Sequence, residues 1–178
     1  AIEAYVIDDF HPLCDGAALE ALRLIYPNLP IVYEKGEDLT SRGKMLVGSC
    51  LAGISFLKGL GFVHAISHMV GAEYDTQHGL TNAIVLPSVL RFNKDGIGSK
   101  ISVMSEAMGL KKNDFDYFYK SICDLLDQFE IPKKLSDIGV KDSSVKSLAK
   151  KALKDSAFTT NPKTATLEEM MELIETSI

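Results

Sequence analysis

The sequence predicts an all-α protein, a multi-helix bundle-like domain, on three observations. Residues 115–129 and 145–153 carry apolar side chains at helical spacing. Thr166 and Glu169 form a capping-box pattern immediately before another apolar stripe. No segment alternates polar and apolar residues over five or more positions, as a half-buried strand would. With 178 residues, 46% of them hydrophobic, the chain is long enough to bury the core of one domain.

The first part of the chain contains one ambiguous segment and two predicted helices. Residues 1–6 fit a helix end or a strand by pattern alone. Asp15 is expected to cap a helix, and Tyr26-Pro27-Asn28 would ordinarily stop it. A second helix should begin at position 40 or 41 and run to about position 58.

This second helix is predicted to be the central buried helix. It combines an apolar stripe with small residues, and small residues on an apolar helix allow neighbours to approach closely. Met45 and Cys50 are therefore expected in the core. The stripe consists of Leu46, Cys50, Ile54 and Leu57, and the small residues are Gly48, Ser49, Ala52, Gly53 and Ser55.

Two prolines and one aspartate mark an expected kink, end and start in the later helices. Pro87 lies inside an otherwise helical pattern, where proline removes a hydrogen bond and costs about 3 kcal/mol, so a kink is expected. Pro132 should end the stripe at 115–129. Asp142 should cap the stripe at 145–153.

Composition narrows the classes of partner. The net charge is −5 and the lysine clusters are interleaved with acids, which is typical of solvated helix faces and predicts no nucleic-acid partner.

Three cysteines without a C-x-x-C pair predict no disulfide framework and favour a reducing compartment, the cytoplasm. No apolar run approaches 18 residues, so no membrane span is expected. The chain opens on AIEAYV without an initiator Met or a signal-like segment, which indicates a cut through a longer protein.

Three of the four histidines, His64, His68 and His78, lie within fifteen residues. His64 and His68 stand four apart, so on a helix they project from one face. His78 lies about 21 Å beyond His64 along an unbroken helix, so a shared site requires the chain to turn between them. The spacing suggests a metal site across a helix–turn–helix. The alternative is a set of hydrogen-bonded core or surface histidines.

The residues between the histidines provide the turn. Gly71 loosens the first segment, and Asp75-Thr76-Gln77 is typical of an N-cap that opens a second helix. In the first turn of that helix the dipole favours neutral imidazole at His78, the form that binds metals.

Other catalytic motifs are absent from the sequence. Glu does not follow His64, so the zincin motif H-E-x-x-H is missing. Gly59-Leu60-Gly61 has no matching third glycine and precedes no βαβ pattern. A serine or cysteine triad has no local support.

The stretch from Gly59 to Asn93 resembles the signature of the iron-containing (group III) alcohol dehydrogenases, G-x-x-H-x-x-x-H-x-x-G-x-x-Y-x-x-x-H-G-x-x-N-A-x-x-L-P. The first five residues, AIEAY, and the tail from Asn161 to Glu168 are similar to further segments of that family, so the resemblance covers essentially the whole chain. His11 stands where the family usually has Asn, and we assign it to loop structure. The signature appears here as Gly61, His64, His68, Gly71, Tyr74, His78, Gly79, Asn82, Ala83, Leu86 and Pro87.

This resemblance implies the dehydroquinate synthase-like fold of an iron-type alcohol dehydrogenase C-terminal domain. It implies that residues 1–6 are helical. It also implies that the helix containing Pro27 is only interrupted there and does not end. Residues 1–178 are expected to form a single all-helical metal-binding catalytic domain, with the N-terminal nucleotide-binding domain absent.

The resemblance also implies roles for the histidines. His64 and His78 match family metal ligands, and His68 matches a catalytic histidine near substrate and nicotinamide. Spacing alone favoured His64 with His68 as ligands, so the two lines of reasoning differ on His68, and we follow the resemblance. Two further ligands, the Asp and His of a D-x-x-x-H segment, would directly precede Ala1.

The function that the resemblance implies is metal-assisted hydride transfer between a small alcohol or aldehyde and NAD or NADP. The divalent metal would be Fe²⁺ or Zn²⁺, and the missing nucleotide-binding domain would hold most of the cofactor. The chain alone should be inactive, and an apolar surface facing the missing domain favours a homo-oligomer. The alternative is a stand-alone helical structural or interaction domain that has lost nucleotide binding.

Overall fold

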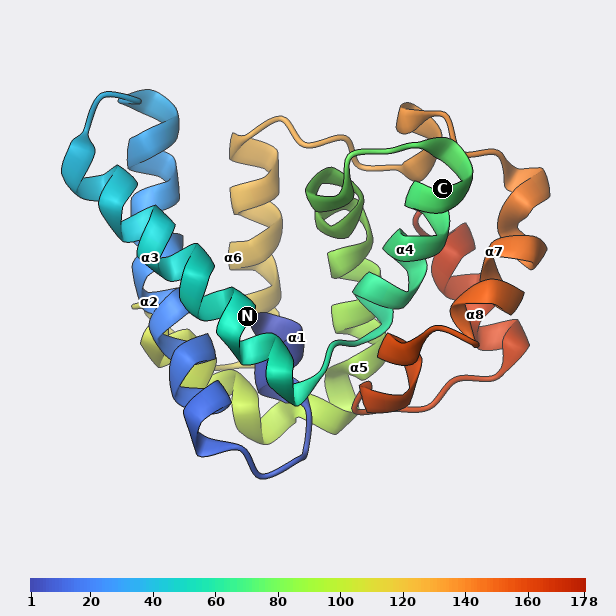
Figure 1. The fold of residues 1–178 in the computed structure, drawn as a ribbon, viewed down its shortest axis with the longest axis horizontal. Helices are drawn as coiled ribbons and strands as arrows, with labels where there is room; N and C mark the ends of the chain where they lie inside the picture. Colours follow the sequence, from blue (N-terminus) through green and yellow to red (C-terminus); the bar gives the residue numbers. More distant parts are fainter. The chain divides into compact units, whose positions relative to one another are not determined.

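The structure, a computed structural model, describes all residues 1–178, and every regular element in it is helical (Figure 1). The predicted all-α class is confirmed. The chain divides into two compact units, the first formed by residues 1–59 and 98–118 and the second by residues 60–97 and 119–178. The α-helices are α1 (Ile2–Val6), α2 (Pro12–Glu34), α3 (Leu39–Ser55), α4 (Phe62–Tyr74), α5 (His78–Ala107), α6 (Phe115–Gln128), α7 (Val145–Ala152) and α8 (Leu167–Glu175). The 3₁₀ turns are η1 (Phe56–Lys58), η2 (Leu135–Ile138), η3 (Asp142–Ser144) and η4 (Ser156–Thr160).

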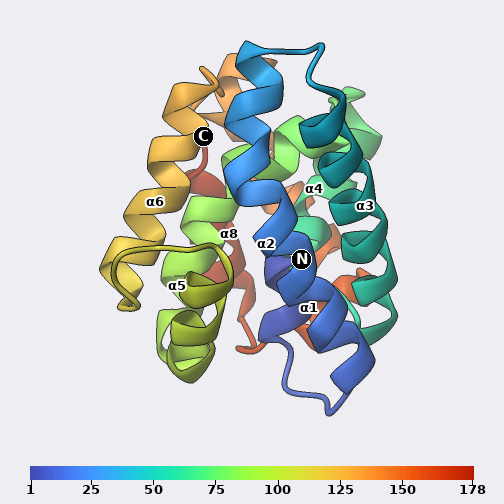
Figure 2. The same ribbon diagram turned by 90° about the vertical axis from the view of Figure 1, so that its left-hand side faces the viewer.

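In the first unit, α2 and α3 lie side by side as a helical hairpin (Figure 2). Gly48 of α3 lets the two helices approach, because a Cβ atom there would lie 2.7 Å from Ile25 Cγ1 and 3.3 Å from Leu24 Cβ. The expected close contact through small residues is thus found at Gly48. Residues 1–6, ambiguous by pattern, are helical from Ile2 to Val6.

The start and the middle of α2 differ from the expectation drawn from the residue pattern. His11 is the N-cap, with its Nδ1 accepting from Cys14 N at 3.3 Å, and Pro12 occupies the first helical position. The prediction that Asp15 caps this helix is therefore wrong, because Asp15 lies within its first turn. The helix also continues through Pro27 and Pro30 to Glu34.

α3 is not the central buried helix that its small and apolar residues predicted. Only Ser41, Gly48 and Ser55 are buried on it. Leu46 is 74% exposed, and Cys50, expected in the core, is exposed. The small residues do contact α2, but nothing among the described residues covers the larger side chains of the opposite face.

Two lysines hold the loops of the first unit. Lys58 is buried and donates to Asp15 Oδ1 at 2.5 Å and to Tyr5 O at 3.5 Å. Lys100 Nζ donates to the carbonyls of Val6 (2.9 Å) and Ile7 (2.6 Å) at the end of α1. A cation at a helix C-terminus satisfies carbonyl groups that have no partner inside the helix.

The second unit contains the larger apolar core, which gathers residues of α4, α5, α7 and α8. α7 packs against both α4 and α8. Its buried residues are Val145, Leu148, Ala149 and Ala152, so the predicted stripe is confirmed. The capping box of Thr166 and Glu169 at α8 is confirmed as well. Asp142 lies in the 3₁₀ turn before α7 and does not cap that helix, so this prediction is wrong.

The cysteines and the helix lengths bear on two further expectations. Cys14, Cys50 and Cys123 are all unpaired, as the sequence predicts. By length and composition no single helix could cross a membrane, although one bent pair of consecutive helices could.

Candidate metal centre

The candidate site lies in the second unit, where the chain turns from α4 into α5. Asp75 adopts the left-handed conformation (φ 52°) and ends α4. Gln77 opens α5, because its Oε1 accepts from Leu80 N at 2.5 Å. The side chain of Thr81, buried in α5, donates to Thr76 Oγ1 at 2.8 Å and fixes the turn from inside. The predicted turn is therefore present, but Gln77 is the cap and Asp75 belongs to the preceding helix.

This turn brings His64, His68 and His78 together. The ring centroids of His64 and His78 lie 5.3 Å apart, those of His64 and His68 5.8 Å, and those of His68 and His78 5.6 Å. The rings of His68 and His78 are nearly parallel, with an interplanar angle of 15°. Residues fourteen positions apart in the sequence thus share one cluster, although His78 would be far away on a continuous helix.

Asn82 connects the two imidazoles that the sequence assigns to a metal. Its Nδ2 lies 3.0 Å from His78 Nε2 and 3.4 Å from His64 Nε2. An amide nitrogen only donates, so both Nε2 atoms accept and carry no proton. The Oδ1 atom of the same side chain is buried without a hydrogen-bond partner. The lone pairs of His64 Nε2 and His78 Nε2, which are of the kind that binds metals, are therefore both directed at Asn82 Nδ2.

Electrostatics at the cluster favour the neutral ring of His78. Burial lowers the pKa of His78 below its ordinary value, and the neighbouring His64 and His68 lower it further. Neutral imidazole is the metal-binding form. No group of three His, Cys, Asp or Glu side chains gathers closely enough to hold a metal ion on its own. The donor set therefore fits part of a metal's coordination shell and leaves the rest to other groups.

His68 also contacts a carboxylate. Its Nδ1 lies 3.1 Å from Asp155 Oδ2, and Asp155 is only 11% exposed at its side chain. The other carboxylate oxygen accepts from Ala157 N at 2.8 Å and caps η4. A carboxylate accepts only, so the imidazole Nδ1 is the donor in this contact.

Asn161, at the far end of η4, holds the N-terminus of α4. Its Oδ1 accepts from Phe62 N at 3.2 Å, and its amide exchanges hydrogen bonds with the buried Asn93 at 3.0 and 2.8 Å. Thr160 Oγ1 donates to Leu60 O at 2.6 Å. The segment that carries Asp155 is therefore anchored beside α4 at both ends.

The sequence did not reveal the roles of Asn82 and Asp155. Asn82 stands four residues after His78, the spacing at which side chains meet on one helix face, and this signal could have identified it. Asp155 is 87 residues from His68, and no local pattern connects them. The fourth histidine, His11, caps α2 in the first unit, in agreement with its assignment to structure.

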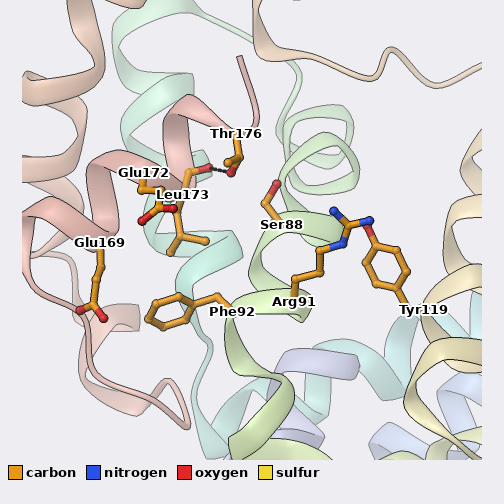
Figure 3. Close-up of a pocket in the computed structure, with 8 residues that line it drawn as sticks. All are labelled: Ser88, Arg91, Phe92, Tyr119, Glu169, Glu172, Leu173 and Thr176. Atoms are coloured by element: carbon orange, nitrogen blue, oxygen red, sulfur yellow. Dashed lines mark hydrogen bonds between the residues drawn. The ribbon is translucent and has the colours of Figure 1, made fainter.

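A second hollow, of about 310 Å³, lies between α5, α6 and α8 (Figure 3). The Arg91 guanidinium points at the ring of Tyr119, 4.7 Å from its centroid, while Glu169 lies at the opposite end beyond Phe92. Burial, followed by a hydrogen bond with Cys123, raises the pKa of Tyr119 to about 12. None of the clustered histidines lines this hollow.

The comparisons with known proteins agree with this fold. The model of the Fe-containing alcohol dehydrogenase family, C-terminal, matches residues 1–178. The chain therefore belongs to the Fe-containing alcohol dehydrogenase family.

Individual relatives cover the chain almost completely. It is 36% identical over 174 residues to the probable alcohol dehydrogenase EutG of Escherichia coli (strain K12), covering 97% of this chain and 44% of that protein. It is 32% identical over 192 residues to the NAD-dependent methanol dehydrogenase of Bacillus methanolicus, covering 100% and 49%. The crystal structure of a 1,3-propanediol oxidoreductase superposes with a TM-score of 0.93 at 35% identity, covering 99% and 48%. The chain thus spans about half the length of the relatives it matches.

Proposed function

We propose that this chain is the metal-binding helical half of an NAD(P)-dependent alcohol dehydrogenase that interconverts a small alcohol and its aldehyde. The observation that carries the proposal is the convergence of His64 Nε2 and His78 Nε2 on one amide, with His68 beside them. Family membership supports it, as do relatives named for alcohol and methanol dehydrogenation. The unpaired cysteines favour a reducing compartment such as the cytoplasm.

His64 and His78 would hold the metal, and the other ligands would come from outside residues 1–178. Imidazole nitrogen suits both Fe²⁺ and Zn²⁺. When bound, such a cation stabilises negative charge on the alcohol oxygen, and NAD or NADP accepts the hydride.

His68 would manage the proton that the alcohol loses. Oxidation of a primary alcohol to an aldehyde releases one hydride from carbon and one proton from the hydroxyl group. His68 Nε2 has the free lone pair that can accept this proton, because Nδ1–H is directed at Asp155. The His68 side chain is 37% exposed, so the proton can pass on to solvent.

The experiment is a nicotinamide-absorbance assay on the full-length enzyme with short primary alcohols, NAD⁺ or NADP⁺, and added Fe²⁺ or Zn²⁺. We expect turnover that a chelator removes and the metal restores. Turnover that survives complete removal of metal would overturn the metal assignment. A folded, metal-loaded enzyme without turnover on any alcohol or aldehyde of the panel would overturn the proposed reaction.

A further inference from the structure

The contact between Asp155 and His68 leads to an inference about how the catalytic histidine is oriented. We propose that Asp155 is a positioning residue that holds His68 as the Nδ1–H tautomer, with Nε2 free on the side of the histidine cluster. The catalytic consequence of this inference rests on the function proposed above, whereas the tautomer itself does not.

The geometry gives Asp155 little freedom to do anything else. One carboxylate oxygen is 3.1 Å from His68 Nδ1, and the other is 2.8 Å from Ala157 N. The side chain is 11% exposed, so water competes weakly for either oxygen. The η4 turn that follows Asp155 is held next to α4 by Asn161 and Thr160. The carboxylate is therefore fixed relative to the α4 backbone that carries His68.

The tautomer decides which atom of His68 can accept a proton. With Nδ1–H donated to Asp155, Nε2 is an acceptor. In the other tautomer Nε2 would carry a hydrogen and could accept nothing from an alcohol. A neutral imidazole has no strong intrinsic preference between the two tautomers, so the fixed carboxylate decides which one forms. The same logic governs the histidine of serine proteases, where replacing the orienting Asp by Asn gives the wrong tautomer.

Asp155→Asn reverses this arrangement while conserving shape. The amide has only one acceptor, Oδ1, and the backbone N–H of Ala157 requires it. The NH₂ group then faces His68 Nδ1, and both contacts are satisfied only if Nδ1 gives up its proton and Nε2 takes it. The variant keeps the cap of η4 because Asn is as good an N-cap as Asp.

The first test reads the tautomer directly and does not depend on activity. Long-range ¹⁵N–¹H spectra of the zinc-loaded full-length protein, with ¹⁵N-labelled histidine, distinguish Nδ1–H from Nε2–H rings. We expect the His68 signals, assigned by their loss in His68→Ala, to change from the Nδ1–H to the Nε2–H pattern in Asp155→Asn. The same pattern in both proteins, or an Nε2–H pattern in the unmodified one, would overturn the proposal.

The second test measures the catalytic consequence. In the full-length enzyme Asp155→Asn should lower kcat by about ten- to a hundredfold, with unchanged metal content. In a His68→Ala background the same substitution should change kcat by no more than about twofold, because Asp155 acts only through His68. Glu73→Gln is the matched control: it removes a carboxylate that binds Lys151 at 2.8 Å and joins α4 to α7 without contacting His68, so kcat should be unchanged.

The outcomes separate the two proposals. Additive losses in the double variant would show a structural role for Asp155 and overturn the positioning. If His68→Ala alone leaves kcat unchanged, the role of His68 in the proposed reaction fails, and the spectra still decide whether Asp155 fixes the tautomer.

Discussion

At the scale of single residues, the candidate centre consists of one amide between two imidazoles and one carboxylate behind a third. Asn82 occupies the lone pairs of His64 and His78, whereas Asp155 contacts His68 through the opposite ring nitrogen. Because His68 is held through a different ring nitrogen and by a different residue from His64 and His78, its role can be separated from theirs by substitution.

The first prediction concerns metal ligation in the full-length enzyme loaded with zinc. His64→Ala and His78→Ala should each empty the site or weaken it greatly, since each removes one of the two converging nitrogens. His68→Ala should keep the metal and lower kcat by about 10²–10⁴. Metal analysis of the purified variants decides, with His11→Ala as a control that alters a helix cap only. Metal loss in His68→Ala alone would contradict the assignment.

The sequence could identify the histidine cluster but not the groups that orient it. Spacing and a turn are local properties, and they suggested a site across the helix–turn–helix, whereas the assignment of His64 and His78 as its ligands came from the family resemblance. Asp155 reaches His68 only because α4 packs beside η4, a long-range contact that no local pattern encodes. Long-range packing therefore places the carboxylate that faces His68.

At the scale of elements, the two faces of α3 behave differently. One face presents Gly48 and Ser55 to neighbours, and the other exposes Leu39 and Leu46, with Leu57 exposed in the η1 turn that follows. Sequence patterns could predict the helix and its close contact but not the exposure. An apolar stripe indicates what a helix face would bury, and says nothing about whether the covering partner belongs to the same chain.

The second prediction tests the close approach at Gly48. Gly48→Ala should lower the free energy of unfolding by about 1–3 kcal/mol, because the new methyl group would overlap Ile25. Gly43→Ala in the same helix should be neutral or stabilising by up to about 1 kcal/mol, because nothing lies within 4 Å and alanine favours the helix. Urea unfolding of the two variants gives the comparison, and equal effects would refute the packing argument.

At the scale of the whole molecule, the described residues contain three clustered imidazoles and no strand. A nicotinamide nucleotide is ordinarily bound by a βαβ unit, and none is formed by residues 1–178.

The third prediction follows from that composition. A polypeptide of residues 1–178 alone should fold but reduce neither NAD⁺ nor NADP⁺ with short alcohols, with or without iron or zinc. The nicotinamide-absorbance assay measures this, and the full-length enzyme serves as the positive control. Metal-dependent turnover from a preparation shown by mass to contain no longer species would overturn the expectation.

The fourth prediction concerns self-association of the same polypeptide. The exposed leucines of α3 and of the following η1 turn should favour association as concentration rises, because large exposed apolar patches are costly in water. Replacing Leu46 and Leu57 with lysine should shift sedimentation toward the monomer. Ser49→Lys adds a similar charge at an exposed polar position of α3 and should have little effect. Association that is indifferent to the leucine changes would assign it to another surface.

If His64 and His78 hold a metal as proposed, their two nitrogens have a consequence for how that metal is identified. Two imidazoles select weakly among divalent ions, and affinity at such sites rises from Mn²⁺ through Fe²⁺ and Co²⁺ to Ni²⁺ and Cu²⁺. The 178-residue polypeptide should therefore take up whichever of the tighter-binding ions it meets, and it should be retained by immobilised nickel without any added tag. The metal recovered with a purified sample records the supply in the growth medium and on the column. The physiological ion is the one that supports turnover after the site has been stripped and reloaded under defined conditions.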